Sequence, residues 1–108
     1  MDIADWRRRI DEVDRKLVAL LGERARAVHE IGKLKAAAGL PVYEPDREKK
    51  VFENARSANA GPLPDRDLQR IFERIVDVMR QSELEVISKR QSPTDGLGDT
   101  EIDPEVND

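Results

Sequence analysis

The chain has 108 residues, of which 38% are hydrophobic and 39% charged, and it contains no cysteine. This length fits one small domain, and the short supply of apolar side chains predicts that another subunit completes the core. Without cysteine, a disulfide framework and a thiolate metal site are excluded, and the single His29 cannot build a zinc centre, so no metal is expected. The charged N-terminus has no apolar run of signal-peptide or membrane-spanning length, which predicts a soluble cytoplasmic protein.

The net charge of −4 is unevenly distributed along the chain. Six acidic residues and no basic residue follow Arg90, which leaves the preceding body with a charge of about +2. No basic run with interleaved aromatic side chains occurs, so nucleic-acid binding is not expected. The body does have enough cations to bind a small dianion.

The first predicted element is a helix over residues 3–38, with Asp2 as the N-cap and Gly39 as the C-terminal stop. Such a helix spans roughly 55 Å, whereas a compact domain of this size has a radius of gyration of about 12 Å. It therefore cannot bury its apolar seam against its own chain alone. The seam repeats at spacings of four and three, and its apolar members are Trp6, Ile10, Val13, Leu17, Leu20, Ala27, Ile31 and Leu34.

Arg24 occupies a position of this seam at which a leucine is expected. A guanidinium does not lose its proton, so its burial is costly unless an anion meets it. Lys35 follows about three helical turns later and projects from nearly the same side of the helix. The two cations predict an anionic ligand. The alternative is that both extend their charged ends into water or pair with Glu23 or Glu30.

A second, shorter helix is predicted after a connector at residues 41–43. Glu44 suits the N-cap and Pro45 the first helical position, and the helix reaches about Ala58. Residues 59–64 (NAGPLP) end it, because glycine and proline interrupt helical periodicity.

The third predicted helix covers residues 65–89, and Glu83 is the one charge on its apolar stripe. From residue 91 onward Ser, Pro, Thr, Gly and acidic residues predominate, a composition that cannot offset the entropy of ordering. We therefore expect an all-α domain at residues 1–90 and an acidic, disordered tail at residues 91–108. His29 is expected at the surface of the first helix.

Four fragments of the chain stand out in combination. They are Arg7 ahead of IDEVDRKLVALLGERA, the segment EIGKLK that ends in Lys35, the segment PVYEPDRE with Arg47 and Glu48, and Glu83 in the third helix. At these spacings the fragments resemble the AroQ-class, all-helical chorismate mutases. The resemblance covers most of the body and implies an intertwined homodimeric helix bundle with a long, a short and a long helix in each chain.

The resemblance implies a chorismate mutase that needs no cofactor and acts in phenylalanine and tyrosine biosynthesis. Its reaction is the unimolecular Claisen rearrangement of chorismate to prephenate. The protein must hold the enolpyruvyl arm over the ring and place positive charge where the ether oxygen gains electron density. In the family's pattern, Lys35 and Glu83 flank this oxygen, and Lys35 is the leading candidate for the donor.

The other site residues bind the substrate in the family's pattern. Arg24 and Arg7 bind the two carboxylates, and Glu48 receives the ring hydroxyl. Arg47 helps to hold a carboxylate or orders the acidic neighbours. Arg7 comes from the partner subunit. The geometry of a helix agrees with two different chains as the source of Arg7 and Arg24. The two residues are seventeen positions apart and about 100° out of phase, so one straight helix does not present both to the same small ligand.

Three positions depart from the best-known bacterial pattern. Glu83 stands where some members have glutamine, Met79 where some have serine, and Glu44 where aspartate is common. Met79 cannot hydrogen-bond a carboxylate, so that contact must come from elsewhere. A glutamate can donate to the ether oxygen only when it is protonated. Burial favours the neutral acid and a nearby lysine favours the carboxylate, so the residues leave both forms open.

Other interpretations of the same residues remain open. Isochorismate pyruvate lyase uses the same scaffold and nearly the same residue types, and a non-catalytic dimerisation module would use the seam charge only to fix register. Arg7 belongs to a run of three arginines that could form a solvated face, and Glu83 could pair with Arg80 in solvent. Arg47 and Glu48 could belong to ordinary surface ion pairs. A complex with another shikimate-pathway enzyme also remains open.

We predict that turnover falls as the pH rises through neutrality, because deprotonation removes the hydrogen that Glu83 donates. The substitution Glu83→Gln should flatten this profile, since an amide donates at any pH. Measuring kcat against pH for both proteins checks the prediction, and a wild-type rate that rises with pH contradicts it.

Overall fold

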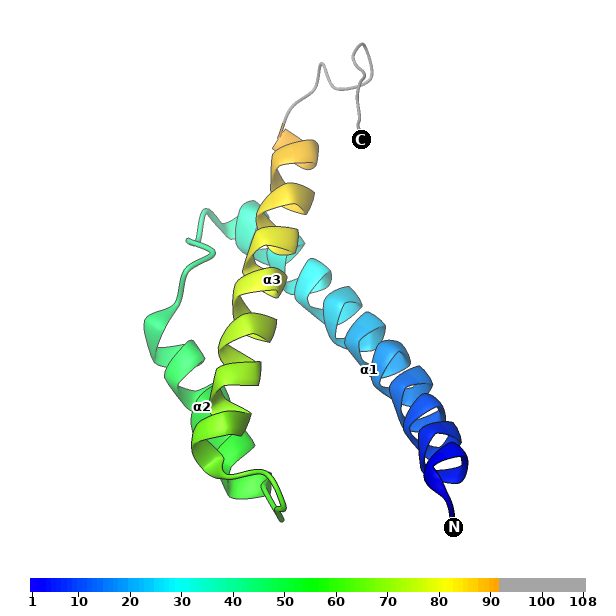
Figure 1. Ribbon diagram of the computed structural model, residues 1–108. Helices are drawn as coiled ribbons and strands as arrows, with labels where there is room; N and C mark the ends of the chain where they lie inside the picture. Colours follow the sequence, from blue (N-terminus) through cyan, green and yellow to red (C-terminus); the bar gives the residue numbers. More distant parts are fainter. Residues whose placement is uncertain (92–108) are drawn as a thin grey trace.

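The computed structural model describes residues 1–91, which form three helices (Figure 1). In chain order they are α1 (Ile3–Ala38), α2 (Pro45–Ala58) and α3 (Asp65–Gln91). The predicted order of a long, a short and a long helix is confirmed. Helix α3 continues past Lys89 to Gln91, so Gln91 belongs to the helix and its assignment to the tail was wrong. The prediction that residues 92–108 are disordered concerns residues outside the described part of the chain.

Local hydrogen bonds fix both ends of α1. The Asp2 side chain accepts from the Asp5 N–H at 2.9 Å, and the Asp5 side chain accepts from the Asp2 N–H at 3.1 Å, which makes a reciprocal capping box. At the other end Gly39 has a φ of 70°, in the left-handed region that suits glycine. The Leu40 N–H then donates to the Lys35 carbonyl at 2.9 Å. The predicted N-cap and C-terminal stop of α1 are therefore confirmed.

A turn organised by Asn59 joins α2 to α3. The Asn59 amide donates to the Leu63 carbonyl at 2.9 Å and to the Asp65 carboxylate at 2.8 Å. Its side-chain oxygen accepts from the Gly61 N–H at 2.9 Å. These bonds hold the turn together, and α2 and α3 run side by side in opposite directions (Figure 1).

Both α1 and α2 pack against α3, and the buried apolar side chains Val76, Met79 and Ile87 all belong to α3. Only the C-terminal half of α1 takes part in this packing, while its N-terminal half extends away from α2 and α3 (Figure 1). Trp6 is 56% exposed and Leu17 is 50% exposed. One chain thus leaves the N-terminal half of the seam uncovered, as the helix length predicted. None of the helices within residues 1–91 has both the length and the apolarity needed to cross a bilayer.

Candidate active site

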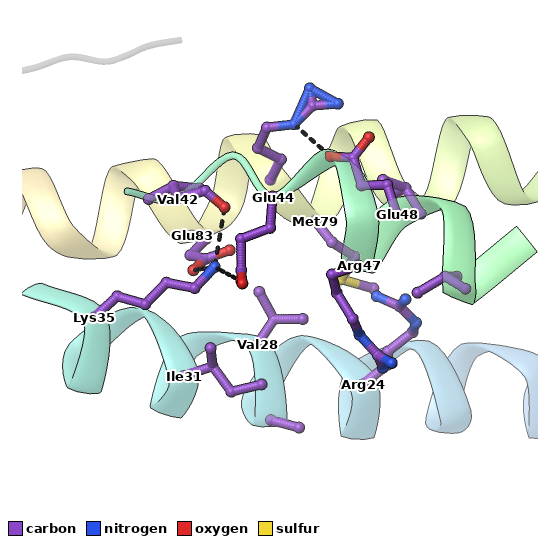
Figure 2. A pocket seen from close by; sticks show the side chains of 14 residues that line it. Arg24, Val28, Ile31, Lys35, Val42, Glu44, Arg47, Glu48, Met79 and Glu83 are labelled. Atoms are coloured by element: carbon purple, nitrogen blue, oxygen red, sulfur yellow. Dashed lines mark hydrogen bonds and ion pairs between the residues drawn. The ribbon is translucent and has the colours of Figure 1, made fainter. Parts of the chain in front are cut away.

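A cavity of about 440 Å³ lies between the C-terminal half of α1, the start of α2 and the middle of α3 (Figure 2). Its wall combines apolar side chains with seven charged ones: Arg24, Lys35, Glu44, Arg47, Glu48, Arg80 and Glu83. The residues predicted from the sequence to form the site line this cavity, Met79 included, with the exception of Arg7. The fold therefore gathers residues from three helices and one connector into a single site.

Lys35 is the centre of the charge network at one end of the cavity. Its Nζ donates to the Val42 carbonyl at 2.9 Å and lies 2.7 Å from Glu44 Oε1 and 3.3 Å from Glu83 Oε2 (Figure 2). Lys35 is 9% exposed and Glu83 is 6% exposed. Glu44 occupies the N-cap position of α2, but its side chain makes no capping hydrogen bond and reaches Lys35 instead. The alternative that Glu83 pairs with Arg80 in solvent was wrong.

The surroundings of Lys35 keep it positively charged. Burial alone lowers the pKa of the ammonium, but the carboxylates of Glu44 and Glu83 outweigh this effect, and the pKa is raised. Glu83 Oε2 is buried and forms the ion pair with Lys35, but it has no partner at hydrogen-bonding geometry among residues 1–91. A buried oxygen that lacks a well-formed hydrogen bond is uncommon. This oxygen can therefore interact with a ligand in the cavity.

Two guanidiniums, Arg24 and Arg47, lie close together at the other end of the cavity (Figure 2). Neither of them has an ion pair or a hydrogen bond within residues 1–91. Burial lowers the pKa of Arg24, and the positive charge of Arg47 lowers this pKa further. The alternative pairing of Arg24 with Glu23 or Glu30 was wrong, and Glu30 instead meets Lys33 at 2.9 Å. Two neighbouring cations without carboxylates form a site that an anion would stabilise.

Arg80 is a charged residue of the cavity that was not predicted from the sequence. Its Nε lies 3.3 Å from Glu48 Oε2, and its guanidinium carbon lies 5.4 Å from the centre of the Tyr43 ring. Glu48 thus pairs with a residue of α3, and the alternative that it belongs to a surface ion pair along α2 was wrong. The position of Arg80 carried a usable signal, because it lies next to Met79 and one turn before Glu83 on the predicted stripe.

His29 is not a surface residue, which corrects the prediction. It is half-buried, and its Nε2 lies 2.6 Å from Ser82 Oγ of α3. The side of α1 that bears His29 turns toward α3 where the two helices cross. The periodicity of α1 predicts which residues share a face, but it does not predict where a second helix crosses that face.

The fold and the cavity define an all-helical protein with a small cavity that is lined by charged side chains of three helices. The chain belongs to the type II chorismate mutase family, whose model matches residues 6–84. Among solved structures, it is similar to form II of the chorismate mutase from Thermus thermophilus, with a TM-score of 0.74 and 36% identity. This match covers 83% of the present chain and 97% of that chain.

Curated relatives include bifunctional enzymes. Over 70 residues the chain is 40% identical to the bifunctional chorismate mutase/prephenate dehydratase of Neisseria gonorrhoeae. This match covers 65% of the present chain and 19% of that protein. Over 54 residues it is 33% identical to the chorismate mutase of Methanocaldococcus jannaschii, which covers 50% of this chain and 54% of that protein. The chain thus spans about a fifth of the length of its bifunctional relatives.

The raised pKa of Lys35 predicts how the ion pairs at Lys35 respond to pH. Because folding raises this pKa, the contribution of Lys35 to stability is complete below about pH 10.5 and is lost as the pH rises through the folded value. The free energy of unfolding of wild type relative to Lys35→Met should therefore be constant from pH 8 to about 10 and decrease above that. Urea unfolding of both proteins across this range measures the difference. An advantage of wild type that grows with pH contradicts the prediction.

Proposed function

We propose that the protein catalyses the rearrangement of chorismate to prephenate. The observation that carries this proposal is the pair of guanidiniums, Arg24 and Arg47, without carboxylate partners at one end of the cavity, opposite the charged Lys35 at the other end (Figure 2). Chorismate has two carboxylates and an ether oxygen. The guanidiniums complement the carboxylates, and the ammonium of Lys35 complements the ether oxygen. Membership of the type II chorismate mutase family supports this substrate.

The proposed reaction needs no nucleophile. The ether C–O bond breaks while a C–C bond forms within the same molecule, so atoms and electrons balance without a second reactant. Arg24 and Arg47 bind carboxylates and restrain the enolpyruvyl arm, and Lys35 donates to the ether oxygen as its electron density grows. Glu83 can contribute a second contact to this oxygen only as the protonated acid, because a carboxylate has no hydrogen to donate. Glu48 accepts the hydrogen bond of the ring hydroxyl.

The contacts of Lys35 define what substrate binding must change. An ammonium has three hydrogens, and Lys35 Nζ already faces the Val42 carbonyl, Glu44 and Glu83. The ether oxygen must therefore replace one of these acceptors. Glu44 is the one whose displacement costs least, because its side chain is 50% exposed and can be solvated, whereas the side chain of Glu83 is buried.

The substrate site is completed by a second copy of the chain in this proposal. Arg7 does not line the cavity of its own chain, and the apolar seam around it, which includes Trp6 and Leu17, is largely exposed. A partner that covers this seam would bury it and bring its own Arg7 toward the cavity. We therefore propose an intertwined homodimer with Arg7 contributed across the interface.

We predict that the purified protein converts chorismate to prephenate and that Arg24→Ala lowers kcat/KM by about a hundredfold or more, since it removes a charged contact to the substrate. Following prephenate formation measures this effect. Arg66→Ala is the matched control, because Arg66 is 80% exposed and lies outside the cavity, and it should retain wild-type activity.

The same assay separates the competing functions. Incubation with isochorismate, with pyruvate as the product measured, identifies the lyase activity. A non-catalytic dimerisation module would show neither product, and Arg24→Leu would stabilise its dimer. Absence of prephenate formation by wild type would overturn the proposed function.

Subunit complementation tests the assignment of Arg7 to the partner chain. Arg7→Ala and Arg24→Ala should each be nearly inactive alone, but unfolding and refolding them together should restore about a quarter of wild-type activity, because half of the dimers are mixed and each mixed dimer has one intact site. The mixture is assayed for prephenate formation after refolding. If Arg7 acted within its own chain, no mixed dimer would contain an intact site and activity would stay low.

A further inference from the structure

Gly32 is a buried glycine in the interior of α1, one turn before Lys35. Glycine is less favourable than alanine inside a helix, so a glycine here calls for a packing reason. A Cβ atom at Gly32 would lie 2.8 Å from Glu83 Cγ, and 3.6 Å and 3.7 Å from Glu83 Oε2 and Cδ. The first distance is well inside the contact distance of two carbon atoms. The Glu83 side chain therefore lies against the α1 backbone in the space that a Cβ would fill.

Gly22 of the same helix has a different environment. A Cβ atom there would meet only Arg26 Nη1 at 3.6 Å, an ordinary van der Waals distance to the end of a flexible side chain. Alanine thus fits at position 22 without movement, but not at position 32. The requirement for glycine comes from α3 and not from α1 itself.

The crossing of α1 and α3 is also fixed next to Gly32. His29 lies one turn earlier on α1, and its hydrogen bond of 2.6 Å to Ser82 joins it to the residue that precedes Glu83. Moving the helices apart to admit a Cβ would stretch this bond. The other response is rotation of Glu83 about χ1, because χ1 sets the position of Cγ and side chains occupy a few staggered wells. Such a rotation would move the carboxylate away from its place 3.3 Å from Lys35 Nζ.

We propose that Gly32 is a positioning residue that sets the Glu83 carboxylate against Lys35. Its catalytic consequence rests on the proposed function, since Lys35 and Glu83 are the groups that would meet the ether oxygen. Gly32 itself has no side chain to contact a substrate. It acts by leaving space for the Glu83 side chain between the two helices, where Glu83 is shielded from solvent and only 6% exposed.

A double-mutant cycle tests this assignment. The proteins are wild type, Gly32→Ala, Glu83→Ala and the double variant, with Gly22→Ala as the control. Glu83→Ala removes Cγ, so alanine at position 32 should then fit and raise the melting temperature by about 4–8 °C relative to Glu83→Ala alone. In the presence of Glu83 the same substitution should leave the melting temperature unchanged or lower it. Gly22→Ala should raise it in both backgrounds.

Kinetics distinguish positioning from a general loss of structure. Gly32→Ala should lower kcat by about tenfold to a hundredfold while KM changes less than about threefold, because Arg24 and Arg47 are untouched. Gly22→Ala should keep wild-type kcat and KM, and this comparison does not require the Glu83→Ala variants to fold. Wild-type kinetics in Gly32→Ala, or the same melting-temperature change in both backgrounds, would overturn the proposal. The thermal cycle needs no activity, so an inactive wild type would refute only the proposed function.

Discussion

The ion pair between Lys35 and Glu83 is the interaction on which the site depends. Both residues are less than 10% exposed, and their charged atoms meet at 3.3 Å between α1 and α3. Loss of Lys35 would leave the buried Glu83 carboxylate without an ion-pair partner within residues 1–91, and an uncompensated buried charge costs about 3–5 kcal/mol. The pair therefore resists any shift of one helix along the other. Glu44 extends this constraint to the connector, so that the start of α2 is held over the same cavity.

The charges of the cavity fall into two groups with different roles. Lys35 and Arg80 face carboxylates of the same chain, whereas Arg24 and Arg47 face none among residues 1–91. Paired cations are held in position without a ligand, whereas unpaired cations are stabilised most when an anion binds. This division explains how one small cavity can be a structural centre of the chain and, in the proposed function, also bind a dianion. It also accounts for the partial burial of Arg24 in an otherwise apolar seam.

The sequence predicted the helices well because each of them depends on local chemistry. Asp2 and Gly39 fix the ends of α1 through bonds within a few residues, and Asn59 does the same for the turn before α3. The contacts that were missed join residues of different elements, and several of them involve α3. Arg80, for example, pairs with Glu48 of α2. The hydrophobic periodicity of one segment gives no information on where another segment packs against it.

The amino-acid order by itself determined the three helices and the charged residues on their apolar faces, and it predicts that a second subunit covers the long first helix. These features follow from propensity, capping and periodicity, which act within a few turns of one helix. Only the tertiary structure decided that His29 meets Ser82, that Glu83 lies against Gly32, and that Arg24 and Arg47 have no counter-ion within residues 1–91. The physical reason is that the crossing point of two helices depends on the shapes of both surfaces together, and no single segment specifies it.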